Sequence, residues 1–564
     1  MSFFEDYKGG LLAYLYTEQS FEKRDIERFR QMTREEKIAS DMLIPDIAIA
    51  KSENHVYVLD APNNYSKLRS GDRVILKKEG GKSGVKALVI DTNTDTITVY
   101  VDDLLISGEV YDMEMDSPDL LSSLIGCLEG ILPATPGASF LRMLSGEEDV
   151  VAEDFLKLNP EEIHGFNNVF ARLNDQQQAA VRSMLKFYPI HVLQGPPGTG
   201  KTQVLAATAI ASSLVNREVV IIASTHQAVN NALLKIRQLD KNVPLFKIGE
   251  LLKAEELGDD VFKFQKFAEY NDYSRENRRK KKYGYIIGMT IWGAISNLGL
   301  RTHSHFRPYM ALVDEASLMP LTYASILGKC SSTICFFGDS RQMPPIFHPE
   351  MESNYFSESI LDCASKVVGT PVCVLPETHR MNDEITKVVS HSFYEPHGIH
   401  LYSATGIAGN RYPSSYFDQL GLKDSVVFVD AETSTPMCKE ENEGEANAAV
   451  GMLKALMEEG HQPNDIAIIT PFRKQVRLLR SKVHEVLSPE QIPLIDTVER
   501  LQGQDVDCII LSFAASDEEY VKEMQDFLFN HNRLNVMISR AKTKVVIFGS
   551  EVVQQYLKLI LSIH

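Results

Sequence analysis

Beyond residue 171 the sequence repeats a single pattern, in which a short apolar run is followed by a loop and then by a helix-forming segment. The apolar runs are IHVLQ, EVVIIAS, YIIGMT, MALVDE, TICFFGD, SVVFVD, IAIIT, DCIILS and VVIFG. Strands that are apolar at every position are buried on both faces, and their alternation with helices indicates parallel sheets covered by helices on both sides. So many strands need two sheets. We therefore predict two α/β domains, residues 171–350 and 351–564, with their junction near residues 346–372.

The chain before residue 171 has a different composition. Residues 17–40 are rich in charged helix formers, and one helical stripe of apolar residues predicts docking on a larger body: Phe21, Ile26, Phe29, Met32 and Ile38. Short β-branched runs separated by turn residues predict a small antiparallel barrel or sheet. The predicted N-terminal units are a helical segment at 1–40, the small β-barrel at 41–112 and a helical connector at 113–170.

Length and composition set the broad class of protein. A chain of 564 residues is too long for one hydrophobic core, and its 44% hydrophobic and 24% charged residues are ordinary for a multidomain globular protein. No apolar run approaches the roughly 20 residues that span a bilayer, and the first residues lack the pattern of a secretion signal. We therefore expect no membrane association and an intracellular location, cytoplasmic or, in a eukaryote, nuclear. Seven scattered cysteines without a CxxC pair indicate buried free thiols.

The charge balance limits how this chain can contact nucleic acid. A net charge of -18 argues against a protein that coats nucleic acid nonspecifically, because phosphate binding needs concentrated lysine and arginine. A local channel remains compatible with it. One dense basic run, at residues 278–282, can contact phosphates or form a solvated helix end, and the pattern favours the solvated helix end.

A glycine-rich motif, GPPGTGKT, directly follows the strand IHVLQ. It satisfies G-x-x-x-x-G-K-[ST] in the strand-to-helix context that phosphate binding requires. Glycines let backbone N–H groups close around phosphates, and the following helix adds the positive end of its dipole. The motif predicts that Lys201 reaches the β- and γ-phosphates of ATP and that Thr202 holds Mg²⁺. The predicted nucleotide-binding residues here are Gly195, Pro196, Pro197, Gly198, Thr199, Gly200, Lys201 and Thr202.

A second strand, ALV, ends in two adjacent carboxylates, Asp314 and Glu315, at the sheet edge where ligands bind. We expect Asp314 to hold Mg²⁺ through water. Glu315 points away from it and is predicted to orient and deprotonate the attacking water, a role that needs a carboxylate within hydrogen-bond reach. An acidic pair alone is often a solvated turn. Beside a P-loop it indicates nucleotide hydrolysis.

Together these motifs resemble those of superfamily 1 helicases, in the branch that contains the nonsense-mediated-decay helicases and the helicase half of the Okazaki-fragment nuclease-helicases. The resemblance covers residues 173–549 and includes the segments STHQAVNN at 224–231 and GDSRQMPP at 338–345. It implies two RecA-like P-loop domains with parallel sheets, preceded by a helical stalk that carries a small barrel. It also implies that Gln177 reads adenine and that Gln342 senses the γ-phosphate.

The second half resembles the same family at LPETHRMNDEI, IITPFRKQ, TVERLQGQDVD and RLNVMISRAK. The resemblance implies that Arg380 and Arg540 are arginine fingers on the γ-phosphate, and that Gly503 and Asp505 contact the nucleotide. The family has glutamate where this chain has Asp505, and Gln-Tyr before the first arginine where this chain has Thr-His. Arginines from a second domain would make hydrolysis fast only when the domains close. The predicted catalytic residues are Lys201, Glu315, Gln342, Arg380 and Arg540.

The resemblance further implies a track for a single strand across the tops of both sheets. It assigns the strand contacts to Thr225, Thr290, Pro344, Thr470 and Thr497. Hydroxyl and backbone contacts to phosphate do not read sequence, so we expect a sequence-tolerant protein. The barrel resembles one that covers the strand in the family. An independent nucleic-acid-binding barrel and a structural or partner-docking barrel remain open.

The expected function is that of an ATP-dependent helicase or translocase, with 5′ to 3′ polarity, acting as a monomer on single-stranded DNA or RNA. The alternative is an ATP-gated clamp that remodels nucleoprotein without processive unwinding. A P-loop kinase or transporter ATPase would leave the second domain and its paired arginines unexplained. The sequence has no nuclease signature, so cutting would need a separate nuclease as partner or a further segment.

Overall fold

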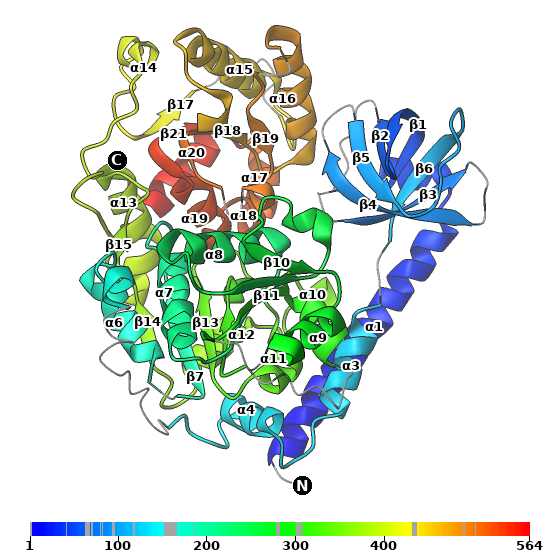
Figure 1. Cartoon of the computed structure of the whole chain (residues 1–564). Helices are drawn as coiled ribbons and strands as arrows, with labels where there is room; N and C mark the ends of the chain where they lie inside the picture. Colours follow the sequence, from blue (N-terminus) through cyan, green and yellow to red (C-terminus); the bar gives the residue numbers. More distant parts are fainter. Residues whose placement is uncertain are drawn as a thin grey trace.

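The computed structural model shows two α/β domains, one above the other, and a small barrel held to one side at the end of a long helix (Figure 1). It describes residues 3–563 apart from short segments. The segments outside the described residues are 41, 62–67, 69–71, 79–80, 82, 93–95, 117–118, 152–165, 187, 278–281, 300–305, 307, 431–436, 489–490 and 502–503. Most of the basic run at 278–282 and the predicted nucleotide contact Gly503 therefore lie outside the described residues.

The first domain is built on an eight-stranded sheet whose strands are all parallel, in the order β10-β9-β11-β8-β12-β13-β7-β14. Its strands are β7 (Ile190–Gln194), β8 (Val219–Ala223), β9 (Leu245–Ile248), β10 (Val261–Phe264), β11 (Ile286–Thr290), β12 (Met310–Val313), β13 (Ile334–Gly338) and β14 (Val372–Val374). Its helices are α6 (Asp175–Met184), α7 (Lys201–Leu214), α8 (His226–Leu239), α9 (Phe267–Asn277), α10 (Ile291–Ala294), α11 (Ala324–Cys330) and α12 (Ile360–Lys366).

Both faces of this sheet are buried, as continuous apolar strands require. In β8, Val220 and Ile222 belong to one hydrophobic core, whereas Val219 and Ile221 belong to the core on the opposite face. The alternation follows from the two-residue period of a strand. Because the strands are parallel, their carboxyl ends meet at one edge of the sheet, and this edge faces the second domain.

The second domain has a five-stranded parallel sheet in the order β17-β21-β20-β18-β19. Its strands are β17 (Val426–Val429), β18 (Ile466–Ile469), β19 (Leu494–Asp496), β20 (Val506–Ser512) and β21 (Ala541–Phe548), and a separate pair joins β15 (Glu377–Thr378) to β16 (Tyr402–Ser403). Its helices are α13 (Asp383–Val389), α14 (Ser415–Gln419), α15 (Glu443–Glu458), α16 (Arg473–Val486), α17 (Glu518–Glu523), α18 (Gln525–Leu528), α19 (His531–Ser539) and α20 (Glu551–Leu561). The fold is therefore α/β with two RecA-like parallel sheets, as the sequence predicts.

The first sheet continues beyond the predicted domain boundary at residue 350. Strand β14 pairs in parallel with β7, and α12 packs on the same domain. Residues up to 374 thus belong to the first sheet. The sequence hides this strand because it has three residues at the sheet edge, and Val372 and Val374 are both exposed.

The barrel is closed, with antiparallel strands in the order β1-β2-β5-β4-β3-β6. The strands are β1 (Leu43–Glu53), β2 (Val56–Asp60), β3 (Arg73–Lys78), β4 (Gly84–Thr92), β5 (Thr96–Val101) and β6 (Val110–Met115). Alternate residues of β5 point inward, including Ile97 and Val99, which are fully buried. The last strand extends three residues past the predicted end at 112.

The long helix α1 (Phe3–Gln31) links the barrel to the first domain (Figure 1). Its buried residues all lie in its first half: Phe4, Tyr7, Leu11, Tyr14 and Leu15. All of them except Tyr14 share a core with α3 (Leu121–Glu129) and α4 (Pro136–Ser145). In the predicted docking stripe of residues 17–40, Phe21, Phe29, Met32 and Ile38 are half-buried and Ile26 is exposed. Phe21 stacks on His348 of the first domain, with 4.5 Å between the ring centroids, before the helix continues to the barrel.

The barrel is held at the end of this stalk by charged pairs. In α2 (Arg34–Ala39), Arg34 donates from Nε and Nη2 to the two carboxylate oxygens of Asp112, both at 2.8 Å. The barrel also contacts the first domain, where Lys253 donates to the carbonyl oxygen of Val89 at 3.1 Å. Of the helices that the structure describes, none combines the length and hydropathy needed to cross a bilayer.

Candidate functional site

The P-loop joins the carboxyl end of β7 to the first turn of α7. Gly198 and Gly200 have φ values of 74° and 84°, which glycine adopts without strain. Lys201 folds back over the loop and donates from Nζ to the carbonyl oxygen of Gly195 at 2.5 Å. A Cβ at Gly195 would lie 2.2 Å from Cγ of Lys201, so the loop closes only around glycine. The loop thus has the shape and donors of a phosphate cradle.

Gln177, predicted to read adenine, lies against this loop. Its Nε2 donates to the carbonyl oxygen of Thr199 at 3.1 Å, and its Oε1 accepts from the backbone N–H of Asn174 at 3.2 Å. The second contact completes a capping box at the start of α6. Both ends of the side-chain amide are therefore bonded to the protein, and they fix α6 against the P-loop.

The acidic pair lies at the carboxyl end of β12, beside the P-loop. Burial and the neighbouring Glu315 carboxylate raise the pKa of Asp314 above its usual range, while Lys201 opposes the shift. A bound cation would stabilise the charged form of such a buried carboxyl group. Glu315 itself has φ 52°, a strained conformation for a residue with a side chain. Such strain is concentrated at functional sites, where the surrounding structure enforces it.

The second domain brings two buried guanidinium groups to the same place. Arg540 is 5% exposed, and burial and the adjacent Arg380 lower its pKa to about 10, with the Glu315 carboxylate opposing the shift. Burial likewise lowers the pKa of Arg380, which Asp505 and Glu315 oppose. The Glu315 carboxylate of the first domain therefore acts electrostatically on both guanidinium groups. The Nε atoms of both arginines are buried and have no hydrogen-bond partner among the residues that the structure describes. Two adjacent buried cations with free donors form a site for an anion.

The segment that carries Arg380 rests directly on the P-loop. Thr378 donates from Oγ1 to the carbonyl oxygen of Pro197 at 2.8 Å, and the backbone N–H of His379 donates to the carbonyl oxygen of Gly198 at 2.9 Å. A Cβ at Gly198 would lie 2.5 Å from Cβ of Arg380. This docking of one domain on the phosphate loop of the other was missed by the sequence reasoning, because nothing in LPETH indicates it.

Gln342 connects the two domains. Its Nε2 donates to Oδ2 of Asp339 at 2.6 Å, and its Oε1 accepts from Nη2 of Arg540 at 2.9 Å. Asp339 Oδ1 also accepts from Nε2 of Gln194, the last residue of β7, at 2.6 Å. A chain of hydrogen bonds thus runs from the start of the P-loop to the second arginine. Gln194 was not among the predicted site residues. Its position, as a polar residue that ends an apolar strand directly before the P-loop, could have indicated it.

The five predicted strand contacts all follow the carboxyl ends of strands. Thr225 and Thr290 follow or end the neighbouring strands β8 and β11, and Thr470 and Thr497 follow the neighbouring strands β18 and β19. Thr225 and Pro344 are exposed, and the other three threonines are buried. The buried hydroxyls help to hold the turns at the strand ends. Thr290, for example, accepts the backbone N–H of Gly293 at 3.1 Å and caps α10.

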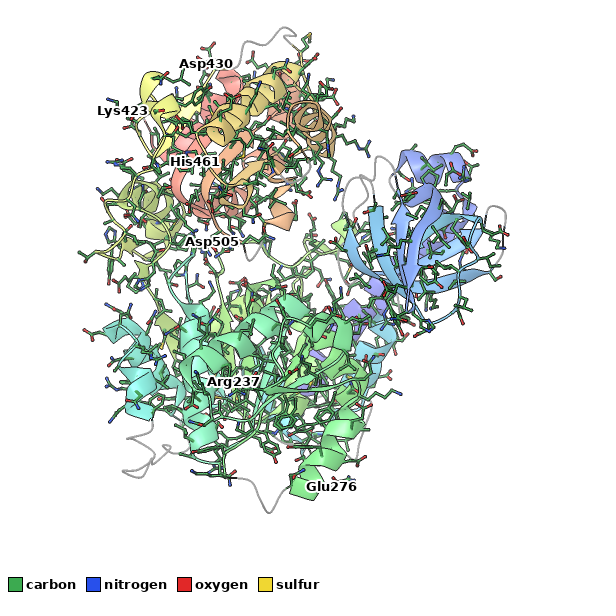
Figure 2. The ribbon with its side chains drawn as sticks, turned by 45° about the horizontal axis from the view of Figure 1, so that its top comes forward. Arg237, Glu276, Lys423, Asp430, His461 and Asp505 are labelled. Carbon is green, nitrogen blue, oxygen red and sulfur yellow. The ribbon has the colours of Figure 1, made fainter. Side chains whose placement is uncertain are left out.

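Asp505 lies at the edge of the second domain toward the first (Figure 2). Its Oδ2 is 3.9 Å from Nε of Arg380, and its side chain is 42% exposed. The sequence predicts a nucleotide contact for Asp505, and the structure places this carboxylate beside Arg380. The shorter carboxylate therefore contributes to the charge balance of the cleft.

The residues present fit ATP and Mg²⁺. A Cβ at Gly195 would collide with Lys201 inside the P-loop, and a Cβ at Gly198 would collide with Arg380, whose guanidinium is buried beside that of Arg540. The hydroxyl of Thr202 and the carboxylate of Asp314 are the hard oxygen ligands that Mg²⁺ prefers. A polyphosphate with a divalent cation matches this set of charges.

Comparison with known proteins agrees with this site. One AAA domain family matches residues 172–393 and a second AAA domain family matches residues 356–552. The chain is 25% identical over 395 residues to the DNA replication ATP-dependent helicase/nuclease JHS1 of Arabidopsis thaliana, 27% identical over 410 residues to dna2 of Schizosaccharomyces pombe, and 25% identical over 535 residues to DNA2 of Mus musculus. The matches cover 67%, 67% and 87% of this chain, and 28%, 28% and 48% of the relatives.

The chain spans less than half of the length of these relatives. Among solved structures, arterivirus nonstructural protein 10, a helicase, aligns over 89% of this chain and 78% of its own, with TM-score 0.40 and 12% identity. Its complex with DNA aligns over 88% and 80%, with TM-score 0.42 and 11% identity. The chain thus matches AAA domain families over residues 172–552 and is a distant homologue of proteins named ATP-dependent helicase/nucleases.

Proposed function

We propose that this protein hydrolyses ATP between its two α/β domains and uses the cycle to move 5′ to 3′ along single-stranded nucleic acid as a helicase or translocase. One observation carries the proposal. The P-loop and Glu315 of the first domain and the buried Arg380 and Arg540 of the second converge on one cleft. A nucleotide bound by one domain would thus be completed by the other.

The residues divide the chemistry among them. Lys201 and the backbone N–H groups of the P-loop bind the phosphates, and Thr202 and Asp314 hold the metal. Mg²⁺, when bound, neutralises developing charge on the phosphate oxygens. Glu315 orients the attacking water and accepts its proton. Arg380 and Arg540 stabilise the charge that develops on the transferred phosphoryl group, a contribution of about 10³ to 10⁵ in rate for such fingers.

Closing the cleft links hydrolysis to movement. Because the arginines reach the nucleotide only from the second domain, binding favours closure and release favours opening. The exposed Thr225 and Pro344 support a strand path over the carboxyl edges of the sheets. The names of the relatives describe DNA replication helicases, which favours a nucleic-acid track. Backbone contacts along such a track would tolerate any sequence.

The first test separates phosphate binding by Lys201 from activation of the attacking water by Glu315. Lys201→Ala should lose both ATP binding and hydrolysis, because it removes the phosphate ligand. Glu315→Gln should lose hydrolysis but retain ATP binding, because the amide cannot take the proton. ATPase rates and equilibrium binding of a fluorescent ATP analogue measure both effects. Wild-type turnover by Glu315→Gln would rule out this residue as the base.

A second experiment separates a motor from an ATP-gated clamp. Duplexes with a 5′ or a 3′ single-stranded tail, in DNA and in RNA, are incubated with protein and ATP. A 5′ to 3′ motor separates only the 5′-tailed duplex. A clamp shows ATPase stimulation by the tails without strand separation, and that result would contradict translocation.

A further inference from the structure

A closed ring of hydrogen bonds crosses from the first domain to the second beside the proposed catalytic site. Asp339 Oδ2 accepts from the hydroxyl of Tyr394 and from Nε2 of Gln342, both at 2.6 Å. The Tyr394 oxygen accepts from Nδ2 of Asn535 at 2.9 Å. The Gln342 Oε1 accepts from Nη2 of Arg540 at 2.9 Å. Asn535 lies in helix α19 and Arg540 directly follows its last residue, so the backbone between them closes the ring.

Every bond of this ring has a consistent direction. Asn535 donates to the Tyr394 oxygen, and the Tyr394 hydroxyl donates to Asp339. Gln342 donates to the same carboxylate and accepts from Arg540. The amide, hydroxyl and carboxylate groups each use the role that their chemistry allows. Such a network is cooperative, because each bond polarises the next.

The ring is buried throughout. Tyr394 and Asn535 are 0% exposed, Asp339 is 2%, Arg540 is 5% and Gln342 is 8%. Water therefore cannot replace a lost partner at low cost. The aromatic body of Tyr394 belongs to the core of the second domain, and only its hydroxyl reaches the first domain. A tyrosine needed merely as core filler would not require that hydroxyl.

We infer that Tyr394 and Asn535 are positioning residues that set the rotation of α19, and with it the Arg540 guanidinium, against Gln342 of the first domain. Asn535 and Arg540 are five residues apart, roughly one and a half helical turns. Asn535 also donates to the carbonyl oxygen of Arg341 at 2.7 Å, which ties the same helix to the first domain a second time. The inference rests on the proposed ATPase function.

The ring makes the arginine finger dependent on domain closure. Tyr394 and Asn535 come from the second domain, whereas Asp339, Arg341 and Gln342 come from the segment that follows β13 of the first. The ring is complete only when both domains meet. A displacement of roughly 1 Å at a catalytic group costs about 10²-fold in rate. The ring thus lets Arg540 act only in the closed arrangement.

The test compares a tyrosine whose hydroxyl donates a hydrogen bond with a tyrosine whose hydroxyl makes none among the described residues. Tyr394→Phe keeps the ring of carbons and removes the bond to Asp339. Tyr412→Phe is the matched control, since the Tyr412 hydroxyl is also buried in the second domain but has no hydrogen-bond partner. Steady-state ATPase with oligo-dT should show a fall in kcat of about 10- to 100-fold for Tyr394→Phe. The KM for ATP should stay close to wild type, the melting temperature should fall modestly because a buried hydrogen bond is lost, and Tyr412→Phe should match wild type in all three.

Combining Tyr394→Phe with Arg540→Ala distinguishes a positioning role of Tyr394 from a general loss of structure. If Tyr394 acts through Arg540, Tyr394→Phe should lower kcat no further when Arg540 is already alanine, because residues that act as a unit are non-additive. Asn535→Ala should behave in the same way. An additive loss in the Arg540→Ala background, or wild-type kcat for Tyr394→Phe, would overturn the inference. A wild-type protein whose ATPase is stimulated by neither oligo-dT nor oligo-U would instead contradict the proposed function itself.

Discussion

At the scale of single residues, the defining feature is the pair of buried arginines in the cleft. Burial and, after it, the adjacent Arg380 lower the pKa of Arg540, so keeping both side chains charged here is unfavourable. The second domain nevertheless places Arg380 next to it and anchors it through a bond from Nη1 to the carbonyl oxygen of Ser539 at 3.1 Å. An arrangement with this electrostatic cost is expected where an anion is to be bound.

Removing either arginine should therefore affect catalysis far more than nucleotide binding. We expect Arg380→Ala and Arg540→Ala each to lower stimulated kcat by about 10³ to 10⁵. Nucleotide affinity should change much less, because Lys201 and the P-loop remain. The double variant should be little worse than either single one. Stopped-flow binding and ATPase assays measure the two effects, with folding checked by circular dichroism. Near-normal stimulated ATPase in either single variant would place that arginine away from the γ-phosphate.

The close approach of the domains at Gly198 leads to a second prediction. Gly198→Ala adds a methyl group 2.5 Å from Cβ of Arg380 at a position with φ 74°. It should open the cleft and lower kcat strongly. Gly146→Ala is the matched control, because Gly146 has φ 80° but no neighbour within 4 Å of the added Cβ. The control should cost about 1–2 kcal/mol of stability and leave kcat unchanged. Equal kcat in both variants would show that the contact at Gly198 does not matter.

At the scale of elements, strand ends and the helices beside them set the positions of the functional groups. The ends of β7, β12 and β13 deliver the P-loop, the acidic pair and the Gln342 segment to one sheet edge. In the second domain, helix α15 holds a buried carboxyl against the end of β20. Glu445 Oε2 accepts from Oγ of Ser512 at 2.7 Å and from the backbone N–H of Ala514 at 2.8 Å.

This carboxyl should make the second domain sensitive to pH. Burial raises the pKa of Glu445 to about 7. The folded state then binds more protons than the unfolded state between about pH 4.5 and 7, so stability falls as pH rises through that window, by at most about 3 kcal/mol. Glu445→Gln should remove this part of the pH dependence. Glu443→Gln, on the exposed face of the same helix, should keep the wild-type dependence.

Urea unfolding of the wild type and both variants at pH 5 and pH 8 checks this prediction. The difference in unfolding free energy between the two pH values should shrink only for Glu445→Gln. An unchanged difference would mean that the Glu445 carboxyl titrates alike in the folded and unfolded states.

At the scale of the whole molecule, a net charge of -18 must coexist with a path for a polyanion. Contacts through hydroxyl and backbone groups at the sheet edges need few lysines, which reconciles the two. The stalk places the barrel beside the first domain (Figure 1). Lys253 of η1 (Leu251–Ala254) donates to the carbonyl oxygen of Val89 in the barrel. The barrel is therefore fixed relative to the edge along which the strand is proposed to run.

Binding to single strands should depend on salt in proportion to the number of phosphate contacts. The logarithm of affinity should fall with the logarithm of salt concentration with a slope of about -0.7 per contact. Fluorescence anisotropy of labelled oligo-dT, titrated with protein at salt concentrations from about 25 to about 300 mM, measures the slope. ATPase rates that are equal with and without single strands at low salt would contradict the motor.

The sequence alone determined the parts of the site that are local. The P-loop, the acidic pair and the alternation of apolar strands with helices are each specified by a few adjacent residues, because backbone conformation and strand burial depend on near neighbours. Both parallel sheets followed from that alternation. The seven cysteines are free thiols, as the absence of a pairing pattern indicated.

Only the tertiary structure decided the contacts that complete the site. The short edge strand β14, the docking face in the first half of α1 and the seat of Thr378 on the P-loop have no local signature. The ring through Tyr394 joins residues 55, 141 and 198 positions apart in the chain. Such contacts depend on how two separately folded domains meet, and many sequences that satisfy the same local patterns would meet differently. The local code therefore determined the chemistry that each domain carries, whereas packing between the domains determined which groups share the cleft.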